Sequence, residues 1–406
     1  MERRNFVKHL TKGSAATIAL GTSLTSQATE LLLHDSQADE LAEHKIADIS
    51  YTQVQLKWPR FVGKNARRDI HGYGPRVSVC VLTTDKGARG WGMHGRRSDE
   101  TNVYLKGKRV SDVFQPSMGV TDSKALPFDV PLHDLAGIIL NKPVYELLGR
   151  KKPITTKCYS GMIYFDELEP KEGPVKTLVK GMDNIVENCA SDYKLGYRQL
   201  KLKIGRGNSW MPRDEGLQRD IEVTQLVHKT FPDCEILVDA NDGYTADTTI
   251  AYLKGIGDIP LFWIEEPFAE TVADYQKLKG WIKANNVKTL LADGEANPNQ
   301  QLLRELEEKK LIDVHLTDLM GYGFTPWRQL MPELKKLGIL ASPHAFGELF
   351  KSYYTAHLTG GLGNTVTIEG VPCTSEEVDF SNYKIVDGKF IPPGKPGFGI
   401  TLLKKS

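Results

Sequence analysis

The sequence predicts an α/β fold, a (β/α)8-type barrel that follows a smaller α+β unit, and three observations support this prediction. From about residue 155 onward, short apolar runs alternate with longer amphipathic segments, the pattern of a parallel sheet covered by helices. The repeating unit is roughly 25 to 30 residues long, and seven or eight such units fit a closed barrel better than an open sheet. Almost every apolar run ends in an ionisable residue, as expected where strands deliver side chains to the mouth of a barrel.

The first 45 residues carry the features of an export signal and are predicted to lie outside the fold. Two arginines, Arg3 and Arg4, precede a weakly apolar stretch from Gly13 to Leu24, and small residues follow at Ser26 and Ala28. The arginine pair resembles the twin-arginine type of signal, which exports folded proteins. We therefore expect a periplasmic or secreted protein. The alternative is a disordered basic tail on a cytoplasmic protein, and the apolar stretch is too short to span a bilayer.

Composition excludes several classes of function. The chain has 406 residues and a formal net charge of +1, so nothing indicates binding to nucleic acid or to an anionic membrane. Its five cysteines are scattered without a CxxC or Cys/His cluster, which indicates neither a zinc site nor a disulfide framework. A chain of this length can bury a large core and is expected to form two domains.

Residues 46–150 are predicted to form the α+β unit. The alternating segment Arg76–Gly92, with a turn at Asp85–Gly87, is typical of a β-hairpin. The polar, basic stretch from Gly92 to Phe114 is predicted to be a loop, and apolar spacing predicts a helix within Pro127–Gly149. The barrel is expected to occupy residues 151–370, and residues 371–406 are expected to fold back on the first unit.

The predicted barrel strands and helices follow one another in order along the chain. The apolar runs cover residues 198–204, 235–240, 261–266, 288–295, 312–318, 338–344 and 364–370, and the clearest amphipathic segments between them are Gly216–Lys229, Val272–Lys283, Asn299–Lys309 and Pro326–Leu337.

Three carboxylates at the ends of consecutive predicted strands indicate a metal site. Asp239, Glu265 and Glu295 would crowd into one low-dielectric mouth, where they would repel one another and take up protons. A hard divalent cation removes that penalty, and oxygen ligands suit Mg²⁺ or Mn²⁺. Because successive strand residues point to opposite faces, Glu265 and Glu266 are not both expected to be ligands.

Two lysines and a histidine with a carboxylate indicate acid–base chemistry. Lys201 and Lys203 share one face of a predicted strand, where two neighbouring ammonium groups near a cation are expected to lower their pKa values; a lysine of lowered pKa can act as a general base. Asp318 and His344 end neighbouring runs, and a carboxylate beside an imidazole orients it and raises its basicity. Taken singly, each of these residues could instead be a solvated or helix-capping side chain.

The ordered series Lys-x-Lys, Asp-x-Asn, Glu-Glu-Pro, Gly-Glu, Asp, Pro-His and a late Glu resembles the enolase superfamily, and in particular its branch of mandelate racemase, muconate lactonizing enzyme and the sugar-acid dehydratases. The resemblance covers nearly all of the chain after residue 50. It implies a barrel whose mouth is covered by the N-terminal unit as a capping domain, a homo-oligomer, and bound Mg²⁺. The implied roles are metal ligand for Asp239, Glu265 and Glu295, general base for Lys203, and electrostatic partner at the substrate carboxylate for Lys201.

The resemblance also implies roles for the remaining strand-end residues. Asn241 would lie beside the metal, His344 with Asp318 would form a dyad on the opposite face, and Glu369 would be a protonated acid that hydrogen-bonds the developing enolate. Two departures from the family pattern concern the substrate: no basic residue follows Asp318, and His94 stands near a position where an acidic residue is usual.

The implied chemistry is removal of a proton α to a carboxylate, which gives an enediolate, followed by dehydration of a sugar acid to a 2-keto-3-deoxy acid. Polar side chains of the capping segment, among them Arg67 and His94, are expected to bind a polyhydroxylated anion. One alternative is a racemase, epimerase or cycloisomerase with the same metal site. A second is an exported sugar-acid binding protein without turnover, against which the complete set of acid and base residues argues.

Overall fold

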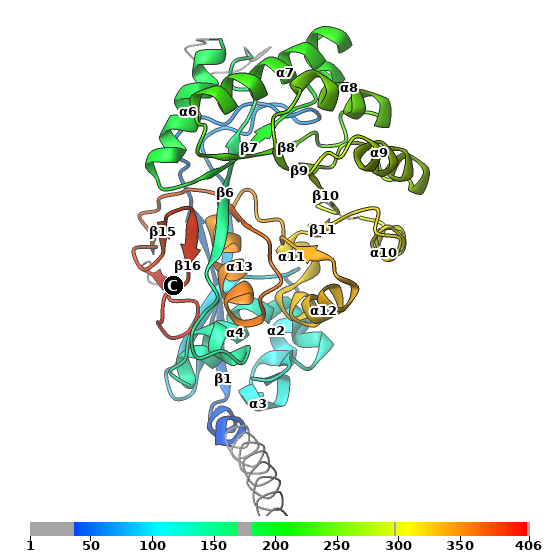
Figure 1. Ribbon diagram of the computed structural model, residues 1–406. Coiled ribbons are helices and arrows are strands. Elements are labelled where there is room, and N and C mark those ends of the chain that lie inside the picture. The colour runs from blue at the N-terminus through cyan, green and yellow to red at the C-terminus, as the bar shows by residue number, and fades with distance from the viewer. Residues whose placement is uncertain (1–35, 169–180, 296–297, 404–406) are drawn as a thin grey trace, which may run out of the picture.

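The computed structural model describes residues 36–168, 181–295 and 298–403. Two sheets organise these residues (Figure 1): an antiparallel sheet of three strands near the N-terminus, and a sheet of ten strands that contains the barrel. The predicted export signal occupies residues that lie almost wholly outside the described ranges. Among the described residues, none of the helices combines the length and the hydropathy that crossing a membrane requires.

The barrel is a ring of parallel strands, which confirms the fold class predicted from the sequence. Each strand from β6 to β12 pairs with the next in chain order, and β13 pairs back with β6. A parallel bridge between Ala341, at the end of β12, and Thr365, just before β13, closes the ring. The strands are β6 (Thr156–Ile163), β7 (Gln199–Lys203), β8 (Glu235–Asp239), β9 (Leu261–Glu265), β10 (Leu290–Asp293), β11 (Val314–His315), β12 (Leu340–Ala341) and β13 (Ile368–Gly370).

Alternation along each strand decides which side chains enter the barrel. On β7, Leu200 and Leu202 pack outward into the core under the helices, so Lys201 and Lys203 point inward. On the neighbouring strands Leu237 and Trp263 form part of a separate interior cluster. This apolar cluster fills the interior of the barrel. The charged side chains lie at the carboxyl ends of the strands.

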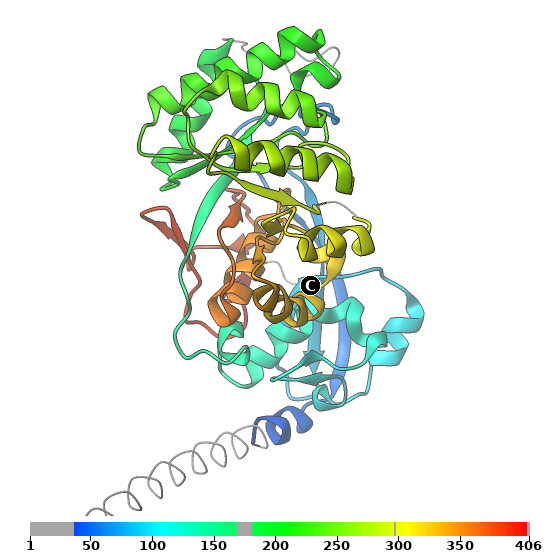
Figure 2. The same ribbon diagram turned by 45° about the vertical axis from the view of Figure 1, so that its right-hand side comes forward.

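Helices connect successive strands and cover the outside of the barrel, as Figures 1 and 2 show. All four helices named from the sequence are present, with ends that differ by a few residues. The side chains of Thr245, Thr271 and Asn299 cap the N-termini of three of the helices that connect the strands. The connecting helices are α6 (Met182–Lys194), η2 (Arg206–Asn208), α7 (Arg213–Thr230), α8 (Ala246–Ile256), α9 (Val272–Ala284), α10 (Gln300–Glu308), α11 (Leu319–Tyr322), α12 (Phe324–Leu337) and α13 (Leu349–Leu362).

The N-terminal unit contains the predicted hairpin and more helix than the sequence indicated. β2 and β3 pair antiparallel around the turn at Gly87, which adopts φ +82°, and β1 joins the other edge of β2. A short helix occupies part of the predicted loop because Ser98 caps it and two acidic residues stand in its first turn. The elements are β1 (Ile46–Gln55), β2 (Arg76–Thr84), β3 (Arg89–Met93), α2 (Asp99–Leu105), α3 (Val110–Val113), β4 (Phe114–Gln115), β5 (Gly119–Val120), η1 (Ser123–Phe128), α4 (Asp129–Ile139) and α5 (Val144–Leu147).

The single helix predicted within residues 127–149 is in fact two, α4 and α5. Asn141 adopts a left-handed conformation with φ +50°, and Pro143 disfavours helical geometry at the residue before it. The break turns α5 away from α4 and brings it against α13.

Two segments connect the N-terminal unit to the barrel. The segment of residues 56–75, between β1 and β2, runs from the three-stranded sheet to the carboxyl ends of the barrel strands (Figures 1 and 2), where Lys64 bridges Phe165. The C-terminal segment pairs β16 with β6, and its Phe398 amide donates to Asp134 Oδ1 of α4 at 2.8 Å. The unit boundaries at residues 45, 150 and 370 stay predictions. The C-terminal strands are β14 (Val378–Asp379), β15 (Lys384–Val386), β16 (Lys389–Ile391) and β17 (Thr401–Leu402).

A buried arginine joins the connection that follows β6 to the one that follows β7. The Arg206 side chain is fully buried; its Nε lies 2.5 Å from Glu167 Oε1, and its Nη1 lies 2.6 Å from Asp220 Oδ1. Nη1 also donates to the carbonyl of Lys203 at 3.2 Å. Because a buried carboxylate without a partner is costly, the two acids depend on this guanidinium.

Replacing Arg206 with methionine is expected to lower the free energy of unfolding by about 3–5 kcal/mol, since it removes the positive charge that both buried carboxylates contact. Lys157→Met is the matched control: its pair with Glu235 is about half exposed, and we expect a loss below about 1 kcal/mol. Urea titration followed by fluorescence and circular dichroism measures both. Equal losses in the two variants would contradict the role given to Arg206.

Candidate active site

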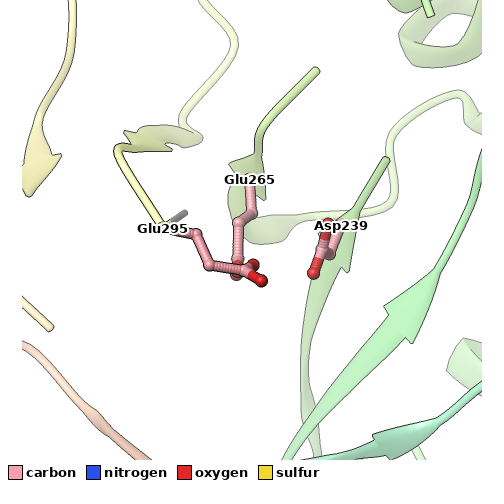
Figure 3. Close-up of side chains that lie close together, drawn as sticks. All are labelled: Asp239, Glu265 and Glu295. Carbon is pink, nitrogen blue, oxygen red and sulfur yellow. The ribbon is translucent and has the colours of Figure 1, made fainter. Parts of the chain in front are cut away.

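Three carboxylates meet at the carboxyl ends of consecutive strands (Figure 3). Asp239 ends β8 and Glu265 ends β9, and the two residues are direct register partners. Glu295 lies two residues beyond β10, after Gly294, whose φ of +102° turns the chain inward. One oxygen from each carboxylate lies within 4.8 Å of one from each of the others. The three residues predicted as metal ligands are thus brought together.

The oxygen atoms of this trio fit a hard cation. Asp239 and Glu265 are fully buried, and Glu265 Oε2 and Glu295 Oε2 have no hydrogen-bond partner among the described residues. Buried oxygens without a donor are costly, and a divalent ion would satisfy them. Glu266 instead adopts φ +39° and accepts from Asn241 Nδ2 at 3.3 Å. Only one member of the Glu265–Glu266 pair therefore joins the trio.

The charges of the trio interact strongly with two lysines. Lys201 Nζ lies 2.8 Å from Glu265 Oε1 and 3.3 Å from Asp239 Oδ2, and Lys203 Nζ donates to Asp239. Burial alone would raise the pKa of Asp239, but the Lys203 and Lys201 ammonium groups outweigh burial and lower it to about 2. Burial and the Asp239 carboxylate raise the pKa of Glu265 well above its ordinary value.

The structure corrects the expected pKa of the lysines. Burial opposes the charge on Lys203, but Asp239, Tyr164 and Glu295 together outweigh burial and raise the pKa of Lys203 above its ordinary value. Burial also opposes the charge on Lys201, and Glu265 and Glu369 outweigh it, so the pKa of Lys201 is raised as well. The sequence-based expectation considered the repulsion between the two ammonium groups, whereas the carboxylates that contact them have the larger effect.

His344 and Asp318 form the expected pair. The isolated bridge between these residues continues the pairing of β11 and β12, and His344 Nδ1 lies 2.9 Å from Asp318 Oδ2. On its other side, His344 Nε2 lies 3.2 Å from Glu295 Oε1 and 3.7 Å from Glu369 Oε2. Burial disfavours the imidazolium, but Glu295 and Glu369 outweigh burial and raise the pKa of His344.

Glu369 lies on the floor of the site but not in the state that the resemblance implied. Its Oε1 is 3.1 Å from Lys201 Nζ, and its Oε2 accepts the amide of Ala345 at 2.8 Å. Burial would raise the pKa of Glu369, but Lys201 and His344 outweigh burial and lower it to about 2. These contacts favour a carboxylate rather than the protonated acid that was expected.

A cavity of about 470 Å³ opens above these groups. Lys203, Glu295 and His344 line it, so a base candidate, a metal-ligand candidate and an acid candidate face one space. Residues of the 56–75 segment, the residue that follows β6 and residues of the chain after His344 form the rest of the wall. They are Trp58, Asn65, Arg68, His71, Gly74, Pro75, Tyr164, Phe346, Gly347, Glu348 and Lys351.

None of the three predicted substrate-binding residues lines this cavity. Arg67 is about half exposed and pairs with Asp242 at 3.0 Å. His94 lies on the N-terminal sheet, 3.0 Å from Ser78 Oγ and with its ring against Tyr51. Asn241 lies beside the trio, and its buried Oδ1 has no hydrogen-bond partner within the described part of the chain.

The cavity residues that sequence reasoning missed come from chain connections rather than from strand ends. Arg68 and His71 belong to the capping segment whose polar side chains were expected to bind the substrate, but the sequence offered no reason to single them out. Trp58, Phe346 and Lys351 gave no local signal, because their place in the wall depends on how the connections fold over the barrel. The segment from Phe346 to Lys351 follows His344 directly, and that adjacency was the one available indication.

Comparisons with known proteins agree with this architecture. The family model described as enolase C-terminal domain-like matches residues 184–406. Arabinonate dehydratase of Saccharolobus solfataricus is 23% identical over 68% of each chain.

Two solved structures from Geobacillus are similar over most of their length. A galacturonate dehydratase, complexed with D-galacturonate and 5-keto-4-deoxy-D-galacturonate, has a TM-score of 0.82 and 30% identity, and the match covers 89% of this chain and 95% of that one. A mandelate racemase/muconate lactonizing protein, complexed with magnesium and tartrate, has a TM-score of 0.80 and 29% identity over 89% and 93% of the two chains. The chain therefore belongs to the enolase C-terminal domain-like family and so to the enolase superfamily, in the branch of mandelate racemase and the sugar-acid dehydratases.

Proposed function

We propose that this protein is a Mg²⁺-dependent hydro-lyase that dehydrates a sugar acid to a keto-deoxy acid. The observation that carries the proposal is that Lys203, His344 and the metal-ligand candidate Glu295 line one cavity. Asp239, Glu265 and Glu295 would hold the ion. The donor set consists of carboxylates, which suits Mg²⁺ and also Mn²⁺.

The reaction begins with removal of the proton α to the substrate carboxylate, for which Lys203 Nζ is the base. Bound Mg²⁺ would stabilise the second negative charge that develops on that carboxylate and would compete with Lys203 for Asp239. Lys201, fixed on the floor by Glu265 and Glu369, offers a positive charge to the developing enediolate. Lys203 thus takes the proton while Lys201 stabilises the product of that step.

Elimination completes the reaction at His344. Because Asp318 accepts the Nδ1 proton, the Nε2 atom carries the proton that is transferred. The β C–O bond breaks, the hydroxyl leaves as water with the Nε2 proton, and the resulting enol tautomerises to the ketone. A racemase or epimerase would use the same first step and then return the proton to carbon from His344, and this is the alternative function.

The cavity wall supports a hydroxylated substrate. The amide of Asn65 and the guanidinium of Arg68 line it, and His71 Nδ1 lies 2.7 Å from the carbonyl of Gly63. Nδ1 must therefore carry a proton, which leaves His71 Nε2 as a hydrogen-bond acceptor; burial lowers the pKa of His71 to about 4. The rings of His71, Tyr164 and Phe346 also contact one another. Such a wall suits a sugar acid, and hexuronates are the first substrates to test, since the similar Geobacillus enzyme was solved with D-galacturonate.

Two further features complete the proposal. The export signal and linker predicted for residues 1–45 would direct export of the folded protein, with the cytoplasm as the alternative location, and the chain would assemble into a homo-oligomer. A sugar-acid binding protein without turnover remains the candidate of a different class, and an assay of α-proton exchange separates binding from catalysis.

The assignment of the metal ligands predicts different results for two adjacent residues. Glu265→Gln is expected to weaken Mg²⁺ binding at least about 100-fold, because it removes a charged oxygen ligand. Glu266→Gln is the matched control and should retain Mg²⁺ affinity within about tenfold, since Glu266 contacts Asn241 rather than the trio. Calorimetric titration of metal-free protein measures both. Equal losses would mean that the ligand choice is wrong.

The two halves of the reaction are expected to separate in variants. In D₂O with Mg²⁺, Lys203→Ala should lose both α-proton exchange and keto-acid formation by about 10²–10⁴-fold, since it lacks the base. His344→Asn should lose keto-acid formation by a similar factor of about 10²–10⁴ yet keep exchange, since Lys203 remains. Proton NMR of a library of mono- and diacid sugars follows both signals. Exchange in Lys203→Ala at the rate of the unchanged protein would exclude Lys203 as the base.

A further inference from the structure

Lys351 occupies a costly position beside the proposed acid. It stands in the first turn of α13 and is only 7% exposed. Positive charge is unfavourable near a helix N-terminus, and an ammonium group is expensive to bury. The helix itself offers no stabilisation for a lysine at this position. Its buried charge is therefore expected to be stabilised by side chains that contact it.

Those partners connect Lys351 to the dyad. Its Nζ lies 2.9 Å from Glu348 Oε2 and donates a hydrogen bond to Asp318 Oδ2, also at 2.9 Å. His344 Nδ1 reaches the same Asp318 oxygen at 2.9 Å. The lysine and the histidine therefore meet on one carboxylate oxygen.

Asp318 is held on both sides. Its Oδ1 accepts the amides of Met320 at 2.9 Å and Gly321 at 2.8 Å, the cap of α11. Its Oδ2 is held by His344 and Lys351. A carboxylate with four donors from three segments has a fixed rotamer, and the orientation of His344 depends on that rotamer.

We propose that Lys351 is a positioning residue for the acid half of the reaction: by holding Asp318 Oδ2 it fixes the direction in which His344 presents Nε2 to the cavity. The inference rests on the proposed function, in which His344 protonates the leaving hydroxyl. Lys351 acts through Asp318, so it serves elimination and not the removal of the α-proton by Lys203.

The test compares Lys351→Met with Lys351→Arg, which keeps the charge, and with Lys279→Met as a matched control. Lys279 pairs with Asp313 at 2.6 Å on the outside of the barrel, so its loss removes a similar ion pair far from the dyad. Each variant is assayed with Mg²⁺ in D₂O for deuterium in recovered substrate and for keto-acid product. Lys351→Gln serves in place of Lys351→Met if the latter does not fold.

In Lys351→Met we expect kcat for dehydration to fall about tenfold to 100-fold, with KM and α-proton exchange changed by less than about threefold. The ratio of exchange to product therefore rises. Lys351→Arg should recover part of kcat, and Lys279→Met should match the unchanged protein.

Two kinetic results would overturn the proposal. A rise in KM at constant kcat would make Lys351 a substrate ligand. A proportional fall of exchange and product, which arginine does not reverse, would make its role structural.

A readout without substrate separates this proposal from the proposed function. The Nδ1 proton of His344, assigned by its disappearance in His344→Asn, should give a sharp signal in the ¹⁵N-histidine NMR spectrum of the unchanged protein. We expect that signal to broaden in Lys351→Met and to stay sharp in Lys279→Met. An unchanged signal in Lys351→Met would refute the positioning role, whereas absence of exchange and product from every sugar acid in the unchanged protein would count against the proposed function alone.

Discussion

The structure depends on charges that are buried together at the ends of barrel strands. Four carboxylates, Asp239, Glu265, Glu295 and Glu369, face two ammonium groups, Lys201 and Lys203, in a space largely closed to water. The lysines compensate only part of the negative charge, and the raised pKa of Glu265 reflects the excess. A divalent cation bound by the trio would supply the two positive charges that balance the set. The excess of buried carboxylates thus explains both why two lysines stand beside them and why the site favours a divalent ion.

Local patterns predicted most of the barrel because a strand covered by helices has a local signature. The runs that became β7 to β13 are apolar and short, and each observed strand ends at the last residue of its predicted run or up to about three residues before it. The first strand, β6, was not recognised, since its sequence contains Lys157, Ser160 and Gly161. Gly161 has a tertiary cause: a Cβ there would lie 2.5 Å from Glu369 Oε1, and nothing near residue 161 in the sequence shows that contact.

The positions of site residues could be predicted where they follow from the order of the strands. They could not be predicted where they depend on the path of the connecting segments. The trio and the His344–Asp318 pair come from strand ends, and the structure brings them together. The wall above them depends on how residues 56–75 and 344–351 fold, so reasoning chose Arg67 where Arg68 lines the cavity. The ionisation of Glu369 and Lys203 also escaped prediction, because it results from partners on different strands.

The C-terminal segment has a consequence for how the protein is made. The buried carboxylate of Asp134 accepts the amide of Trp91 at 2.9 Å and that of Phe398 at 2.8 Å. Domains often complete their folding in the order in which the ribosome delivers them. Here Asp134 of the N-terminal unit lacks the hydrogen bond from Phe398 until the last residues of the chain have left the exit tunnel. Its final packing is therefore a post-translational event, and a nascent chain stalled before residue 398 would display an unfinished unit to chaperones and proteases.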